Sequence, residues 1–479
     1  MRKKILLLLI TIATLFVSCF EDLDDTIQPA SDLDIENFIY RGLNYFYLYK
    51  ADTPELANDN FANQGELNTF LNSFQTPESL FSFLKSPQDR FSLLVANYNE
   101  LENALNGVSL NNGMEFGLVY YPNNSSNVFG YVRYVLPGTD AESKNLERGM
   151  IFNSIDGQQL TDTNFSELLS LNSYEIGLAT FDGTAITPTG ESITLVKQQY
   201  TENPILIAET LTVQGQKIGY LMYNAFTRDF DSQLNGVFAQ FKADAITNLV
   251  IDLRYNGGGS VQTAIDLSSM ITGQFYNQVF ANEEWNTDRQ AEYASPKLFD
   301  NQIFTGEAIN SLNLTKTYVL TTKRSASASE LVINGLNPYI DMTQVGDTTT
   351  GKYQASTTLY DSNNFRRDGA NPNHTYAMQP LIFKSLNKVG NTDYDNGLTP
   401  DIELKESYLN LGVLGDVNET LLAAAIAEIE NSGKLINIQS KPRINFKLVK
   451  DSNSFIPFND DMHVDKEIPQ DIINKIHFK

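Results

Sequence analysis

Two segments of the sequence place glycines or serines directly after an apolar run, where they can support chemistry. The apolar run 249–253 leads into three consecutive glycines at 257–259. Glycines at the carboxyl end of a strand allow a sharp turn, and backbone N–H groups at the following helix start can stabilise an anion, including the oxyanion of acyl transfer. The second run, 317–320, is followed by SASASE at 325–330 and an apolar stretch at 331–336. A serine at such a strand-to-helix turn is expected to be exposed and close to backbone donors, although Ser/Ala runs are also common helix starts.

The remaining residue types exclude most other catalytic sites. The three histidines are His374, His463 and His477, and the single cysteine is Cys19. There is no HExxH pattern and no Cys/His cluster, so we expect no metal site, no cofactor and no Cys–His nucleophile. A Ser-His-Asp arrangement would have to use His374, which stands in a polar stretch typical of a loop.

A third segment imitates a nucleotide-binding loop. Residues 346–352 read GDTTTGK, which fits GxxxxGK. A P-loop next needs Ser or Thr for Mg²⁺ and a helix to receive the phosphates. Here Tyr353 follows, and residues 357–360 have the pattern of a strand, so we do not expect nucleotide binding.

The elements that must position these segments indicate a multidomain α/β protein. Hydrophobic residues make up 42% and charged residues 19% of the 479 residues, enough to bury sizeable cores in about three domains. Helical spacing of apolar residues predicts an N-terminal helical domain over 32–105. Short strands and glycine turns follow over 106–200, and alternating strand and helix patterns predict an α/β core over 201–432. The extension 433–479 has no clear pattern.

The segment 106–200 resembles a PDZ domain of the bacterial protease type. Such a domain adds an extended peptide to a sheet edge and holds its terminal carboxylate on backbone N–H groups. Gly113, Phe116, Gly117 and Leu118 stand where this domain type places its carboxylate-binding loop and first pairing strand, so they are the expected peptide-binding residues. The alternative is a small β domain that only separates its neighbours.

The N-terminus predicts export. Three basic residues precede an apolar run at 5–17, which has the length of a signal-peptide core and is too short to span a bilayer. The run ends in LFVSC, which resembles a bacterial lipobox, so residues 1–18 are expected to be a lipoprotein signal and Cys19 the lipidated residue. An ordinary secretory signal with a chance cysteine is the alternative. Residues 19–31 form an acidic tether, either a surface-export signal or a solvated linker.

These features predict that the protein lies in the cell envelope and is anchored by lipid, most simply at the outer membrane. The sequence does not distinguish the periplasmic side from the surface side. The formal net charge of −24 argues against a nucleic-acid partner.

Taken together, the motifs resemble the C-terminal processing peptidases, or tail-specific proteases. The matching segments are 252–259 (DLRYNGGG), 325–330 (SASASE), 345–352 (VGDTTTGK) and 397–402 (GLTPDI), in the family's order and spacing. The resemblance implies Ser327 as nucleophile, Lys352 as its base, and the N–H groups of Gly258 and Ala328 as oxyanion donors. It also implies that Glu330 caps or braces the serine's helix.

One position departs from the family pattern. The Gln that usually follows the lysine by four residues and orients its amine is replaced by Ser356, with Gln354 two residues earlier. If neither side chain orients Lys352, the dyad is weakened.

The resemblance implies a serine endopeptidase that cuts protein substrates near free C-termini, without metal or cofactor. A lysine can act as the base only when it is neutral, a state that burial favours. The alternative is a catalytically weak or inactive peptide-binding lipoprotein on the same fold. A glycan-binding lipoprotein has little support, since Trp285 is the only tryptophan.

Overall fold

The computed structural model describes residues 29–122, 126–392, 394–431, 446–455 and 462–465, together with Ile468 and Ile472. The predicted signal, Cys19 and nearly all of the predicted tether lie outside the described residues. Within those ranges no helix is both long and apolar enough to cross a membrane.

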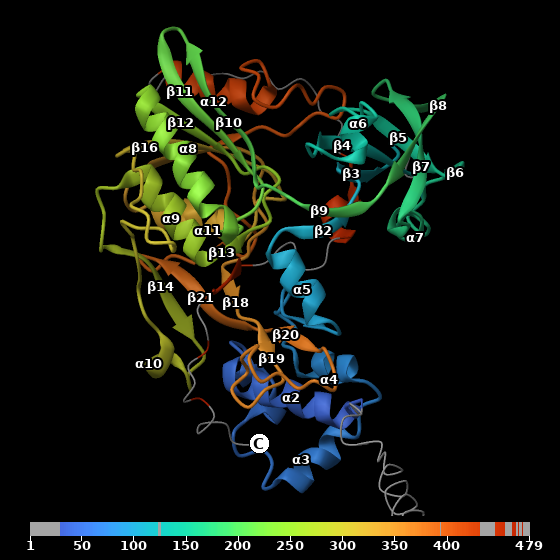
Figure 1. Ribbon diagram of the computed structural model, residues 1–479, viewed down its shortest axis with the longest axis vertical. Coiled ribbons are helices and arrows are strands. Elements are labelled where there is room, and N and C mark those ends of the chain that lie inside the picture. Colours follow the sequence, from blue (N-terminus) through green and yellow to red (C-terminus); the bar gives the residue numbers. More distant parts are fainter. Residues whose placement is uncertain are drawn as a thin grey trace, which may run out of the picture.

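An N-terminal helical region packs against a small sheet from later in the chain (Figure 1). Its helix α2 begins with a capping box, in which Ser31 and Asp34 exchange hydrogen bonds, and α4 begins with Pro77 at its first position. Strand β1 pairs with β20, which pairs with β19, so residues 359–379 complete this region. The elements are α2 (Asp32–Phe46), η3 (Lys50–Asp52), η4 (Pro54–Leu56), α3 (Gln64–Leu71), α4 (Pro77–Leu84), β1 (Leu93–Val95), α5 (Tyr98–Leu105), β19 (Leu359–Tyr360) and β20 (Ala377–Gln379).

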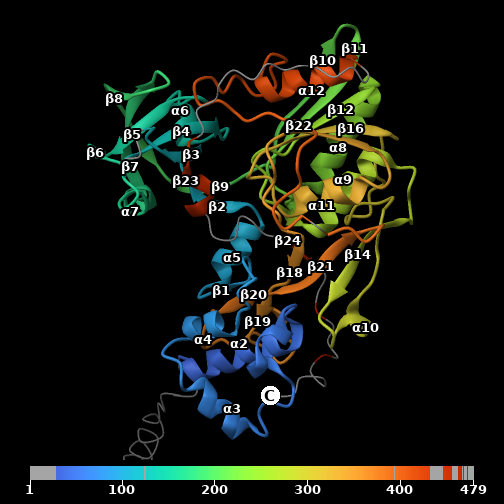
Figure 2. The ribbon, with the colours of Figure 1, turned by 180° about the vertical axis from the view of Figure 1, so that it is seen from behind.

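The next region is a β domain set apart from the rest (Figures 1 and 2). The chain enters through β2 and leaves through β9, and these two strands pair antiparallel as a connecting ribbon. The domain's own sheet has the order β3-β4-β5-β7-β8, with β6 beside β5. Its elements are β2 (Val108–Asn111), β3 (Met114–Tyr120), β4 (Val128–Val135), α6 (Asp140–Ser143), β5 (Ile151–Ile155), β6 (Gln158–Gln159), α7 (Phe165–Ser170), β7 (Ser173–Phe181), β8 (Ile186–Val196) and β9 (Gln198–Thr201).

The α/β core contains a six-stranded sheet of order β10-β11-β12-β16-β17-β22. Only β10 is antiparallel. β11, β12 and β16 have apolar residues on both faces, because helices cover both faces of the sheet. Leu249 and Ile251 pack with α8, α9 and α11, whereas Val250 packs with α12. The elements are β10 (Ile205–Val213), β11 (Gln216–Tyr223), η5 (Arg228–Phe230), α8 (Asp231–Asp244), β12 (Asn248–Asp252), α9 (Val261–Thr272), β16 (Lys316–Thr321), α11 (Ala328–Leu336), β17 (Asp341–Gly346), β22 (Ile402–Glu403) and α12 (Thr420–Asn431).

A second six-stranded sheet lies below this core in Figure 1, in the order β13-β24-β18-β21-β14-β15. It joins strands from distant parts of the chain: β13 (Gly259–Ser260), β14 (Val279–Trp285), β15 (Lys297–Leu298), β18 (Gln354–Ser356), β21 (Leu381–Asn387) and β24 (Met462–His463), with α10 (Gln290–Tyr293) following β14.

The C-terminal extension, which the sequence left unplaced, contributes strands to two sheets. β23 (Leu448–Asp451) pairs with β3 of the β domain and is followed by η6 (Ser452–Phe455). β24 then pairs with β13 and β18 of the second sheet.

Candidate active site

Ser327 lies at the turn between β16 and α11, as the sequence predicts. Its backbone is in an unusual conformation for a residue with a side chain, with φ of 65° and ψ of −114°. Such strain, about 1–3 kcal/mol, persists only where the surroundings impose it, and it is concentrated at functional sites. Ala328 begins α11, so its N–H belongs to the first turn, where no intrahelical acceptor is available.

The expectation that this serine is exposed was wrong. Ser327 is 0% exposed, and among the described residues no hydrogen-bond partner contacts its Oγ. The turn is buried because loops from both neighbouring strands bind it: Ala326 donates to the Asn256 carbonyl at 3.0 Å, and Thr350 donates to the Ser325 carbonyl at 3.0 Å.

The glycine loop after β12 is organised by Asn256, a residue that sequence reasoning did not single out although it stands inside the motif. The side chain of Asn256 donates to the Tyr223 carbonyl at 2.8 Å and accepts the Gly258 N–H at 2.8 Å. Gly258 thus lies beside the serine turn, but its N–H is already donated to Asn256. The predicted oxyanion role requires that Asn256 release it.

The third glycine of the loop has a steric requirement. Gly259 has φ of 135°, and a Cβ at this position would lie 2.3 Å from the carbonyl oxygen of Phe226. Only glycine permits this close approach of two backbones.

A buried ionic cluster supports the strand end from which the glycine loop departs. Arg254 is fully buried and donates to both carboxylate oxygens of Glu419 at 2.9 Å and, through Nε, to Asp252 at 2.9 and 3.0 Å. It also lies 3.2 Å from Glu406. Burial opposes the charge of Glu406, but the guanidinium groups of Arg148 and Arg254 lower its pKa to about 2. The glycine loop therefore begins at a strand end that is fixed by paired, buried charges.

Lys352 lies in the loop between β17 and β18 and is 1% exposed. Its Nζ is 4.9 Å from the centre of the Phe91 ring, which the N-terminal helical region supplies. The preceding Gly351 is held by Arg90, which donates to its carbonyl at 2.6 Å. A strand follows this loop rather than a helix, in agreement with the rejection of a nucleotide-binding loop.

Glu330 joins the serine turn to the lysine loop. Its Oε2 accepts the backbone N–H groups of Ser327 and Lys352, both at 2.8 Å. Its Oε1 accepts the Gly351 N–H at 2.7 Å and the Thr349 hydroxyl at 2.5 Å. Burial raises the pKa of Glu330, and these four donors oppose that rise. The carboxylate thus holds the two candidate catalytic residues on one oxygen atom.

The two candidates for the missing Gln both form hydrogen bonds to residues outside the lysine loop. Gln354 donates to the Tyr49 hydroxyl at 2.8 Å, and Ser356 donates to the Met462 carbonyl at 3.3 Å. These bonds attach the N-terminal region and the C-terminal extension to β18. Neither of these two hydrogen bonds orients Lys352. Tyr49 and Phe91 could not have been selected from the sequence, because both residues stand in helical or loop segments without a motif.

His374 belongs to a different cluster. Its Nε2 lies 2.9 Å from Asp361, which also pairs with Arg41 at 2.8 Å, and its ring packs near Phe38. Among the described residues no hydrogen bond connects this ring with Ser327. The geometry does not favour a Ser-His-Asp triad. Nor do the described residues contain a group of three or more acidic, histidine or cysteine side chains arranged to hold a metal ion.

The expected peptide-binding residues of the β domain face the chain's own β23. Leu118 pairs with Lys450 and Gly117 with Asp451 in an antiparallel register, and Phe116 donates its N–H to Ser452 Oγ at 3.1 Å. Gly113 precedes β3 with φ of 92°. The edge therefore accepts a strand, and the strand present is an internal segment of this chain. Recognition of a substrate C-terminus there stays a prediction.

Comparison with known proteins agrees with this arrangement of motifs. Residues 217–404 match the model of peptidase family S41, and residues 34–93 match the peptidase S41 N-terminal domain. The carboxy-terminal processing protease CtpB of Bacillus subtilis (strain 168) is 27% identical over 214 residues, which cover 44% of this chain and 38% of that protein. A carboxyl-terminal-processing protease of Picosynechococcus sp. is 23% identical over 295 residues, covering 61% of this chain and 64% of the relative. The matched region thus spans less than two thirds of either relative.

Among solved structures, a protein from Bacteroides fragilis NCTC 9343 that is assigned to the S41 proteases superposes with a TM-score of 0.66 at 26% identity. The match covers 83% of this chain and 98% of that chain.

Proposed function

Because the chain belongs to peptidase family S41, we propose that it is a serine endopeptidase in which Ser327 is the nucleophile and Lys352 its base. The observation that supports this most is the shared carboxylate of Glu330, which accepts the N–H groups of both residues at 2.8 Å. One acceptor thus joins a strained serine at the start of a helix to a buried lysine. A serine peptidase with this arrangement needs no histidine as its base.

The reaction follows from the roles of these groups. Ser327 Oγ attacks the carbonyl carbon of the substrate and gives its proton to a neutral Lys352 Nζ. The Ala328 and Gly258 N–H groups stabilise the oxyanion. The proton then passes to the leaving amine. Water next attacks the acyl-enzyme while Lys352 accepts a proton from it, and Lys352 returns that proton to Ser327 Oγ as the acyl group leaves. Substrate binding must first expose Ser327 and free the Gly258 N–H from Asn256.

Two substitutions test the dyad directly. Ser327→Ala and Lys352→Met should each abolish hydrolysis of an unstructured protein substrate, while circular dichroism stays unchanged. A fluorophosphonate should label wild type at Ser327 and should fail to label Ser327→Ala. Near-wild-type turnover by either purified variant would exclude this dyad.

A catalytically weak or inactive peptide-binding protein is the second candidate function. The burial of Ser327, the bond between Gly258 and Asn256, and the absent Gln favour it. Fluorophosphonate labelling separates the two functions, because a dead site leaves Ser327 unmodified even when the protein binds peptides.

We further propose that the enzyme acts in the cell envelope on proteins with free C-termini, anchored through lipid on Cys19. The support is the signal-like N-terminus and the strand-accepting edge of the β domain.

A further inference from the structure

The strand β24, from the C-terminal extension, fills a gap in the second sheet. Gly259 pairs with Met462 and Ser260 with His463 in parallel register, while Ser356 of β18 also pairs with His463. On the β18 side the Val464 N–H donates to the Ser356 carbonyl at 3.0 Å. Without these residues β13 and β18 would expose two unpaired edges, which is the feature that accepts an extended peptide in strand addition.

The groove that β24 fills lies between two strands that directly follow the glycine loop and the lysine loop. β13 directly follows Gly258, and β18 begins two residues after Lys352. We propose that the groove between β13 and β18 binds the substrate as an extended strand, that Ser260 and Arg228 select a carboxylate side chain in it, and that residues 462–465 compete for it. This inference rests on the proposed peptidase function and adds the class of substrate.

The selectivity comes from the contacts of Asp465 directly after β24. Ser260 Oγ donates a hydrogen bond to its carboxylate, Arg228 Nη1 lies 3.9 Å away, and His463 Nε2 lies 3.6 Å away. Burial opposes the charge, but His463, Ser260 and Arg228 together hold the pKa of Asp465 below its ordinary value. Ser260 and Arg228 belong to the core, so they would meet a substrate carboxylate in the same place.

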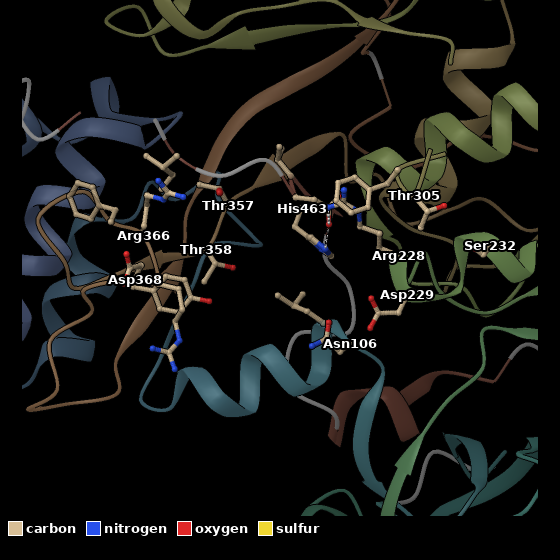
Figure 3. A pocket seen from close by; sticks show the side chains of 18 residues that line it. Asn106, Arg228, Asp229, Ser232, Thr305, Thr357, Thr358, Arg366, Asp368 and His463 are labelled. Atoms are coloured by element: carbon tan, nitrogen blue, oxygen red, sulfur yellow. Dashed lines mark ion pairs between the residues drawn. The ribbon is translucent and has the colours of Figure 1, made fainter. Parts of the chain in front are cut away.

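The surroundings leave room for substrate side chains. A cavity of about 640 Å³ lies beside β24, between α5, the segment around 357–368 and the core, and both Arg228 and His463 line it. Figure 3 shows the His463 and Arg228 side chains close together at the core side of this cavity, with Arg366 and Asp368 on the opposite wall. The guanidinium of Arg228 stacks on Phe304 at 3.2 Å from the ring centre, and among the described residues its Nε has no hydrogen-bond partner.

The competing segment is held nearby by its own chain. β23 is anchored through Asp451, which lies 3.0 Å from both Arg133 and Arg324. A segment tethered in this way acts at a high effective concentration, so even weak pairing by 462–465 keeps the groove occupied. While residues 462–465 occupy the groove, a substrate strand cannot pair with β13 and β18.

The first experiment measures side-chain selection. Full-length protein is given a peptide copying residues 460–467 or the same peptide with Asn for Asp465, and inhibition of hydrolysis of a common unstructured substrate is compared. The Asp peptide should inhibit roughly tenfold more strongly, because hydrogen bonds to a charged group are the stronger ones. Arg228→Gln should reduce this ratio severalfold, whereas Arg228→Lys and the exposed-charge control Lys316→Gln should keep it. An unchanged ratio in Arg228→Gln would overturn the selectivity.

The second experiment measures competition in the full-length chain. Asp465→Asn should loosen β24, so fluorophosphonate should label Ser327 several times faster than in wild type, and hydrolysis should rise in parallel. Equal labelling rates in wild type and Asp465→Asn would overturn the competition while leaving the peptidase function intact. Absence of Ser327 labelling in both proteins would instead overturn the proposed function.

Discussion

Replacing Glu330 by Gln tests whether one carboxylate positions both candidate catalytic residues. In wild type its two oxygens accept four hydrogen bonds, three from backbone N–H groups and one from the Thr349 hydroxyl. A Gln side chain has the same shape, but its NH₂ group cannot accept. In the least disruptive orientation the NH₂ replaces Oε1, the Thr349 hydroxyl turns to accept from it, and the Gly351 N–H loses its acceptor.

The lost and weakened hydrogen bonds determine how much Glu330→Gln lowers the free energy of unfolding. One buried backbone donor left without a partner costs about 1–3 kcal/mol, and the remaining bonds weaken when the acceptor loses its charge. The lower cost of burying a neutral amide offsets part of this loss. We expect a net destabilisation of about 2–4 kcal/mol. The common acceptor of Ser327 and Lys352 is then an uncharged amide oxygen, and Gly351, next to Lys352, has lost its acceptor. Because both residues are held less firmly, kcat/KM should fall by about 10²-fold or more.

Urea unfolding and amide hydrogen exchange, combined with peptide hydrolysis, measure the two effects separately. Exchange should accelerate in peptides covering 325–331 and 347–353, where the donors to Glu330 lie. Asp361→Asn is the matched control, since Asp361 is a largely buried carboxylate with several donors but belongs to the Arg41–His374 cluster. It should lower stability while leaving hydrolysis close to the wild-type rate. Wild-type hydrolysis and exchange in Glu330→Gln would refute the positioning role.

Three further outcomes are expected. Burial raises the pKa of Asp266 from 3.8 to about 8, so this carboxyl keeps its proton in the folded protein while the unfolded chain ionises near pH 4. The contribution of Asp266 to stability is therefore full below about pH 4 and is lost as the pH rises to about 8. Over that interval Asp266→Asn should gain stability relative to wild type by at most about 1.4 kcal/mol per pH unit. Urea unfolding of both proteins at each pH tests this expectation. His374→Ala should lower the unfolding midpoint but retain hydrolysis; a loss as complete as that of Ser327→Ala would mean that the base is misassigned. Cys19→Ala should move the protein from membrane to soluble fractions, and unchanged fractionation without an acyl mass on the mature N-terminus would exclude the anchor.

The local signals in the sequence predicted the elements that carry the motifs. The apolar runs 249–253 and 317–320 are β12 and β16, because buried parallel strands need apolar residues on both faces. The helix after Ser327 and the absence of a helix after Lys352 also follow from local pattern. These elements depend on contacts within a short stretch of chain, which is why their residue types reveal them.

The partners of the site could not be predicted in this way. Phe91 contacts Lys352 and Tyr49 contacts Gln354, both from the N-terminal region, and Glu419, the residue before α12, pairs with Arg254. Such contacts depend on how separate regions pack, and a Tyr, Phe or Glu in a helical pattern has the same appearance whether it lies on the surface or against a catalytic loop. The prediction that Ser327 is exposed was wrong for the same reason, because its burial depends on contacts with loops from other parts of the chain.

The C-terminal extension connects the β domain to the serine turn through Asp451. This carboxylate is buried, and Arg133 of β4 and Arg324, three residues before Ser327, together hold its pKa below the ordinary value against the effect of burial. A peptide that replaced β23 on the edge of β3 would remove that carboxylate from both guanidinium groups. Unless the peptide supplied its own acid there, the buried Arg133 and the partly buried Arg324 would each lose this ion pair, at a cost of several kcal/mol. Occupation of the β domain and the conformation of the serine turn are therefore energetically linked, although no residue of the β domain belongs to the dyad.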